Sequence, residues 1–125
     1  MPVTSTEPRN PLNHRELERY LARVGDRWRL ERALLGGARV ADARGAPPQR
    51  ERGPEYVVVL VSDTFGGMPW LERVSQAANL WDAAEMGAHA DVHCYTRREL
   101  ERKIERLKRV RDAVMHGIEL APQSA

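Results

Sequence analysis

Residues 55–120 carry the clearest secondary-structure signals and read EYVVVLVSDTFGGMPWLERVSQAANLWDAAEMGAHADVHCYTRRELERKIERLKRVRDAVMHGIEL. Its apolar run Val57–Val61 predicts a strand that is covered on both faces. A turn at 62–67 follows, and Pro69 suits the first turn of a helix, where its missing N–H is not needed. The apolar face of that helix is predicted to contain Trp70, Leu71, Val74, Ala77, Ala78 and Trp81.

A second strand and a second helix follow in the same stretch. Residues 88–95 alternate in polarity, which predicts a strand. Successive side chains of a strand point to opposite faces. One face would carry Asp91, His93 and Tyr95, and the other Val92 and Cys94. Thr96 and Glu99 have the spacing of a capping box, which begins a helix.

That last helix is predicted to be long. Its apolar stripe contains Leu100, Ile104, Leu107, Val114 and Ile118. Gly117 is its predicted C-cap. The Arg and Lys residues between positions 97 and 111 lie mostly off the stripe and are interleaved with acids. This pattern is typical of a solvated, ion-paired face and makes a nucleic-acid surface unlikely.

The N-terminal part predicts one helix and one short strand. Asn13, with Glu16 three residues later, has the spacing of a capping box. Gly25 is expected to end this helix early. Residues 29–36 are predicted to form a strand. Residues 36–54 are rich in Gly and Pro and are predicted to be a loop, of a length that is usually functional or mobile.

The chain is expected to form one domain. Its 125 residues can bury a core without disulfides. We expect a disordered N-terminal tail at 1–12, the domain at 13–120 and a frayed tail at 121–125. The predicted order helix–strand–loop–strand–helix–strand–helix indicates an α/β (α+β) fold with a small mixed sheet of three or more strands, flanked by helices.

Composition excludes several classes of protein. The formal net charge of +2 is too small to indicate nucleic-acid binding. The single cysteine, Cys94, excludes an internal disulfide framework and is expected to be a small core residue in a reducing cytoplasm. No apolar run reaches the length of a membrane span and no secretory leader is visible. We therefore expect a cytoplasmic protein without membrane contact.

The amino-acid sequence of residues 14–120 resembles that of the small nucleotidyltransferase domains of the polymerase-beta superfamily. In that family a Gly-Ser turn follows one strand, the next strand carries Asp-x-Asp, and a later strand carries a third Asp. The segment 34–39 (LLGGAR) matches the turn, with Gly37 in place of the serine. The segment 57–63 (VVVLVSD) matches the second strand, and 91–96 (DVHCYT) matches the third.

The resemblance implies a site built on magnesium. Three carboxylates would hold two Mg²⁺ ions, which align an attacking hydroxyl with the leaving pyrophosphate. Asp91 takes the place of the third carboxylate and Glu55 that of the first, but Val57 replaces the second. Gly36 and Gly37 would approach a nucleoside triphosphate through backbone N–H groups. With Val57 at one position, the two-metal clamp lacks a ligand.

These residues also have ordinary structural interpretations, which stay open. Asp91 and Glu55 could be solvated acids at strand ends, and Gly36–Gly37 a simple turn. His93 shares a face with Asp91 and could join it in binding a metal or polarising a water, or could be structural. The three tryptophans are expected in the core: Trp28, Trp70 and Trp81.

The functional prediction is a nucleotidyltransferase-like domain with lost or altered catalysis that acts as a nucleotide-binding or protein-interaction module. By analogy with the family, its partner would be a nucleotide or a genomically linked helical protein. A homo-oligomer stays open.

Two alternatives remain. In the first, the protein is an active Mg²⁺-dependent enzyme that transfers a nucleotidyl group to a protein or small molecule. Its rearranged site would use Glu55, Asp91 and an acid of the long loop, Asp42 or Glu51. In the second, the segment 61–67 (VSDTFGG) resembles BolA-like domains, which are α+β partners of monothiol glutaredoxins. The part from Asp91 onward has no counterpart in those domains.

Overall fold

The computed structural model describes residues 12–47 and 53–120. The predicted tails, apart from Leu12, and Glu51 lie outside the described residues. In chain order the elements are α1 (His14–Arg27), β1 (Arg32–Gly36), α2 (Ala38–Ala43), β2 (Tyr56–Val61), the 3-10 helix η1 (Asp63–Gly67), α3 (Trp70–Asn79), α4 (Ala83–Met86), β3 (Ala90–Tyr95), α5 (Arg97–Arg106), α6 (Lys108–His116) and β4 (Ile118–Leu120). None of the helices in these ranges has the length and apolar character that a bilayer span requires.

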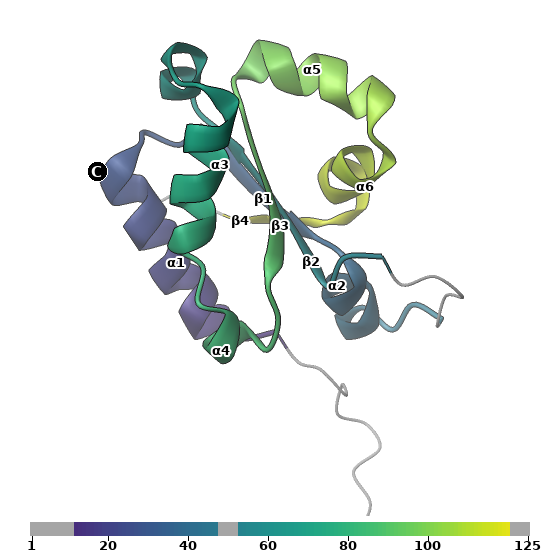
Figure 1. Ribbon diagram of the computed structural model, residues 1–125. Coiled ribbons are helices and arrows are strands. Elements are labelled where there is room, and N and C mark those ends of the chain that lie inside the picture. The colour runs from purple at the N-terminus through teal and green to yellow at the C-terminus, as the bar shows by residue number, and fades with distance from the viewer. Residues whose placement is uncertain (1–11, 48–52, 121–125) are drawn as a thin grey trace, which may run out of the picture.

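The described strands form one mixed sheet with the order β3-β2-β1-β4. β1 is antiparallel to both β2 and β4, whereas β2 and β3 are parallel. Helices α1 and α3 cover one face of the sheet, and α5 and α6 cover the other (Figure 1). The predicted fold class, a mixed sheet flanked by helices, is confirmed.

β2 is the centre of the core. All of its residues are buried, as its continuous apolar run predicts. Tyr56, Val58 and Leu60 pack with α1 and α3, whereas the residues between them pack with α5 and α6. Burial of each such side chain is favourable by about 1.5–3 kcal/mol relative to exposure. The position of β2 between two helical layers therefore supplies much of the driving force for folding.

β3 shows the predicted alternation. Val92 and Cys94 belong to the cluster under α1 and α3. Tyr95 belongs to the cluster under α5 and α6, and Asp91 contacts a side chain of α6. The prediction that Cys94 is a core residue is confirmed, and burial raises the pKa of its thiol to about 12. The polar face of β3 is thus turned toward α5 and α6.

Three predicted element boundaries are wrong. α1 does not end at Gly25 but continues to Arg27. The predicted loop 36–54 contains α2, and the predicted strand 29–36 begins only at Arg32. A helix follows β1 directly because the backbone leaves Gly37 with φ of 104°, a conformation that favours glycine.

The predicted last helix is two helices and a strand. It breaks at Leu107, whose φ of −114° and ψ of 111° are extended. Ile118 belongs to β4 and pairs with Leu35, so it is not part of a helical stripe. The break lets α6 lie on β1, where Ala113 is close to Gly36, and the chain then adds β4 beside β1. These contacts join residues that are far apart in the sequence, so no periodic pattern of apolar residues predicts them.

Trp28 and Trp81 are in the core, as predicted. The same prediction is wrong for Trp70, which is 41% exposed, and Leu71, which is 79% exposed. Both stand at the beginning of α3, and the Trp70 ring stacks on Tyr95 with 5.3 Å between ring centroids. Trp81 follows α3, which ends at Asn79.

Candidate functional site

A cleft of about 780 Å³ lies between α2 and α6, where β1 ends and β2 begins. Its volume is within the range of roughly 300–1,000 Å³ that small-molecule sites occupy. Gly36, Gly37 and Val57 line its floor, and α6 contributes Lys108 and Arg109. We call it the α2–α6 cleft. It brings together the predicted turn, the start of the second strand and cations from the last helix.

The two glycines of the predicted phosphate turn lie close to other parts of the chain, and only at Gly37 does the contact exclude a side chain. A Cβ on Gly37 would lie 2.7 Å from the Glu55 carbonyl oxygen and from the Tyr56 Cα. A Cβ on Gly36 would lie 3.0 Å from Ala113. The N–H groups of the next two residues, Ala38 and Arg39, each donate at 3.0 Å, to the carbonyl oxygens of Pro54 and Glu55. These two amides are therefore already paired within the protein.

Asp91 lies beside this cleft and is held by two side chains. Its Oδ2 accepts from Arg109 Nη1 at 2.8 Å and from His93 Nε2 at 3.0 Å. Burial alone would raise the pKa of Asp91, but the hydrogen bonds and charges of Arg109 and His93 outweigh burial and lower it. Asp91 is therefore a paired carboxylate at neutral pH.

The polar contacts continue along β3. His93 Nδ1 lies 2.8 Å from the Tyr95 hydroxyl, which fits a ring with its proton on Nε2 and the hydroxyl as donor to Nδ1. Burial raises the pKa of Tyr95 to about 12, and the nearby charge of Asp91 acts in the same direction. Tyr95 is thus a neutral donor, and the contacts hold the His93 ring in one orientation.

Glu55 has a different partner. Its Oε1 accepts from Arg39 Nε at 2.6 Å, and Arg39 Nη2 also donates to the Gly87 carbonyl oxygen at 3.2 Å. The Arg39 guanidinium lies 5.9 Å from the centre of the Tyr56 ring, which packs with α1 and α3. Asp91, by contrast, is bound to α6. The two acids of the predicted site are engaged separately, each by an arginine.

Within the described residues, the three-carboxylate site for two Mg²⁺ ions that the resemblance implies is not formed. Mg²⁺ requires oxygen ligands in near-octahedral geometry. Val57 is the register partner of Asp91 and is buried and apolar. Within 12–47 and 53–120, no three His, Cys, Asp or Glu side chains are grouped so that they could hold a metal ion. Asp42, proposed as a substitute ligand, does line the α2–α6 cleft.

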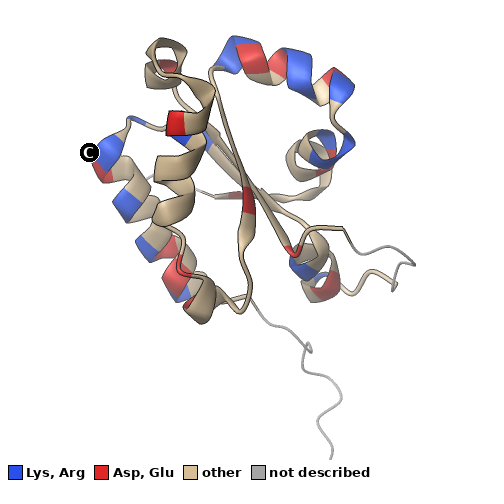
Figure 2. Cartoon of the chain, in the orientation of Figure 1, with Lys and Arg blue, Asp and Glu red and all other residues tan. Residues whose placement is uncertain are grey.

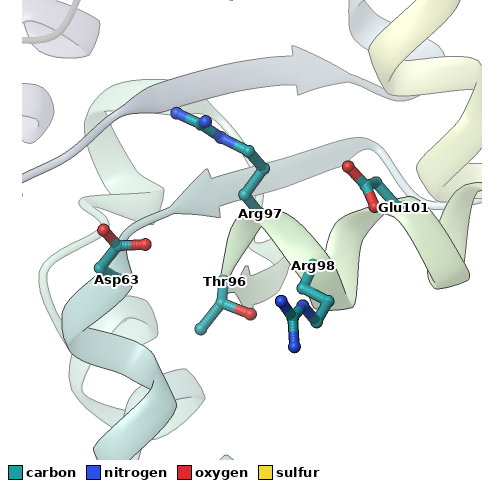
Figure 3. A pocket seen from close by; sticks show the side chains of 5 residues that line it. All are labelled: Asp63, Thr96, Arg97, Arg98 and Glu101. Carbon is teal, nitrogen blue, oxygen red and sulfur yellow. The ribbon is translucent and has the colours of Figure 1, made fainter.

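A second cavity, of about 530 Å³, lies where β2 and β3 end. Asp63 and Glu101 line it together with Thr96, Arg97 and Arg98. Figure 3 shows that the side chains of Arg97 and Arg98 point in opposite directions. Arg97 donates at 2.6 Å to Glu31, a residue that does not line this cavity. These side chains do not converge on one point, so we place the candidate site in the α2–α6 cleft.

Sequence reasoning does not place Lys108 and Arg109 at a cleft. The interleaved charges predict a solvated, ion-paired face, and both side chains are exposed and paired with acids, but they belong to a separate helix. The break at Leu107 starts a new helix at Lys108, and both side chains line the cleft. Arg44 lines it as well and donates to the carbonyl oxygens of His116 and Gly117. The apolar stripe continues through Leu107, so periodicity gives no signal of this arrangement.

Acid is expected to remove the contribution of Asp91 to stability. Because the folded-state pKa of Asp91 is lowered, its contribution is full above the unfolded value near 3.8 and is lost as the pH falls through the folded value. Urea unfolding of the wild type and of Asp91→Asn, from about pH 6 to about pH 3, measures this. The difference in unfolding free energy between them should shrink toward low pH. A difference that stays constant would contradict the assignment.

No family model, curated protein or solved structure matched the chain.

Proposed function

We propose that this protein is a nucleotidyltransferase-like domain that has lost metal-dependent catalysis and acts as a binding module for a nucleotide or a protein partner. One observation carries the proposal. The two acids that the resemblance assigns to magnesium, Asp91 and Glu55, each pair with an arginine, and Val57 stands where the remaining acid would be. The inference from fold to family is an analogy.

The order of elements around the cleft supports the resemblance. β1 ends at Gly36, and Gly37 precedes α2. β2 then returns antiparallel to β1, and β3 lies parallel to β2 with Asp91 opposite Val57. This is the order of turn, second strand and third strand on which the resemblance rests. Gly36, Gly37 and Val57 of these parts line the α2–α6 cleft, and Asp91 contacts Arg109 beside it.

The chemistry of the cleft favours binding over transfer. Nucleotidyl transfer in this family relies on metal ions to neutralise phosphate charge and to align the attacking group. Here arginines neutralise the two acids, and we derive no catalytic step through a metal. What remains is a cleft of small-molecule size with cationic side chains at its wall.

The protein-partner form of the proposal has its own support. Trp70 and Leu71 are large apolar side chains exposed at the beginning of α3. Figure 2 shows that α3 carries few charges, whereas α1 and α5 are densely charged. Neighbouring exposed apolar side chains of this kind are what a contact site for another protein uses.

A thermal-shift titration with ATP, GTP, CTP and UTP, each with and without Mg²⁺, tests the nucleotide form. A ligand that binds only the folded state stabilises it by about 2.7 kcal/mol at 100 times its dissociation constant. For a domain of this size that corresponds to a rise of roughly 10 °C in Tm. We expect a shift with at least one nucleotide and no release of pyrophosphate.

Two outcomes would change this conclusion. Mg²⁺-dependent pyrophosphate release that Asp91→Ala abolishes would support the active enzyme, with Asp42 as the obvious further ligand. No shift with any nucleotide would remove the nucleotide form and leave the protein-partner form, which a pull-down with a Leu71→Asp control would then test.

A further inference from the structure

We propose that the α2–α6 cleft binds an oligophosphate anion through its own cations, without a metal ion, and that Arg109 exchanges Asp91 for the phosphates when it does so. This inference rests on the proposed function and deepens its nucleotide form. It names the counter-charge of the ligand and the internal competitor that the ligand displaces.

The first observation is the charge of the cleft. Three permanent cations line it, Arg44, Lys108 and Arg109, against two carboxylates, Asp42 and Asp112. Two of the cations have short contacts with acids: Lys108 Nζ lies 2.6 Å from Asp112, and Arg109 Nη1 lies 2.8 Å from Asp91. The cleft therefore holds cationic groups whose present partners are single carboxylates.

These ion pairs are easily exchanged. The side chain of Lys108 is 79% exposed and that of Arg109 is 53% exposed. Water screens pairs at such positions, so they add little to stability. A phosphate carries more charge than a carboxylate and accepts two parallel hydrogen bonds from a guanidinium. A multiply charged phosphate ligand should therefore compete successfully with Asp91 for Arg109.

The spacing of the cations favours a long anion. Lys108 and Arg109 are at the beginning of α6. The Arg44 guanidinium lies at the other end of α6, where it donates to the carbonyl oxygens of His116 and Gly117. With a rise of 1.5 Å per residue, the ends of this helix are about 12 Å apart. A single carboxylate or phosphate would reach one end only. An oligophosphate, as carried by a nucleoside triphosphate, is better matched to cations distributed in this way.

The proposal predicts that removing the Asp91 charge changes ligand affinity in the opposite direction from that expected for a metal site. If Asp91 held Mg²⁺ for a nucleotide, its removal would abolish binding. If Asp91 competes for Arg109 and repels the phosphates, its removal should strengthen binding. Asp91→Asn keeps the size and the hydrogen-bonding groups of the side chain while removing its charge, so the two cases give results of opposite direction.

The experiment is isothermal calorimetry with ATP and with inorganic triphosphate, each in EDTA and in excess Mg²⁺. We expect binding in EDTA, and weaker binding in Mg²⁺ because the ion neutralises part of the ligand charge. Arg109→Ala should raise the Kd about tenfold or more, since it removes a charge-assisted contact. Asp91→Asn should lower the Kd by about twofold to fivefold. Arg102→Ala, an exposed cation of α5 that lines neither cavity, should leave the Kd unchanged.

Each contrary result has a distinct meaning. Binding that requires Mg²⁺ and disappears in Asp91→Asn would overturn this inference, while the nucleotide form of the proposed function would stand. An Arg109→Ala variant with wild-type Kd would also overturn it. If neither probe binds in either condition, this inference and the nucleotide form both fail, and only the protein-partner form survives. Circular dichroism of each variant confirms that it is folded.

Discussion

Gly37→Ala is expected to destabilise the protein by about 4 kcal/mol. Gly37 has φ of 104° and ψ of −179°, a region of backbone conformation that is essentially restricted to glycine and costs other residues about 1–3 kcal/mol. The added Cβ would also lie 2.7 Å from backbone atoms of Glu55 and Tyr56, which cannot rotate away. Overpacking of this kind adds about 1–3 kcal/mol. Urea unfolding followed by circular dichroism gives the change in unfolding free energy.

Gly45→Ala is the matched control. Gly45 also has a positive φ, of 78°, but a Cβ there would meet no heavy atom within 4 Å. Its expected cost is therefore only the backbone strain, about 1 kcal/mol. If the two variants lost equal stability, the close approach of β2 to Gly37 would not be the reason for the glycine. Because the strain at Gly37 acts on folding, a nucleotide titration of Gly37→Ala must be normalised to its lower stability.

Arg73→Met is expected to cost about 3 kcal/mol. Arg73 is only 6% exposed, yet it lies at the junction of α3, β3 and α5. Its guanidinium donates to both carboxylate oxygens of Glu99, at 2.7 and 3.3 Å, and to the carbonyl oxygens of Met68 and Cys94. Methionine fills similar space but leaves these acceptors without their donor, which is the costly way to break a buried pair.

A double-mutant cycle with Glu99→Gln separates the contribution of the Arg73–Glu99 ion pair from that of the hydrogen bonds of Arg73 to backbone carbonyl oxygens. We expect the double variant to be more stable than the sum of the single effects predicts, with a coupling of about 1–2 kcal/mol. Lys108→Ala serves as the control, because its pair with Asp112 is at the surface and should contribute less than about 1 kcal/mol. Additive effects of Arg73→Met and Glu99→Gln would show that the two carbonyl contacts, and not Glu99, account for the loss.

Local patterns predicted the elements with the strongest periods. The run Val57–Val61 indicated a strand buried on both sides, and β2 is buried throughout. The capping box of Thr96 and Glu99 is present, with each side chain bonded to the backbone N–H of the other residue. These signals work because period and capping are set by residues that are neighbours along the chain. The alternation that puts Asp91 and Tyr95 on one face of β3 belongs to the same class.

The same patterns failed where distant contacts override them. Trp70 has helical spacing with the core residues of α3, but its ring is partly exposed to solvent and stacks on Tyr95. The apolar stripe through Leu107 predicts one continuous helix, but the helix ends at Leu107 and a second helix, α6, packs on β1. Periodicity records which side chains are apolar and how they are spaced, and it does not record the surface against which they pack.

At the site, the residue types alone establish which side chains are available and which chemistry is missing. Asp91 and Glu55 are present, and Val57 cannot bind a metal whatever its surroundings. The contacts of those acids follow from the fold: Arg109, eighteen positions after Asp91, binds Asp91, and Arg39 binds Glu55. An ion pair depends on distance in space, and the break in the last helix brings Arg109 within reach of Asp91. Residue type is written in the sequence, whereas the neighbours that neutralise a charge are assembled by the fold.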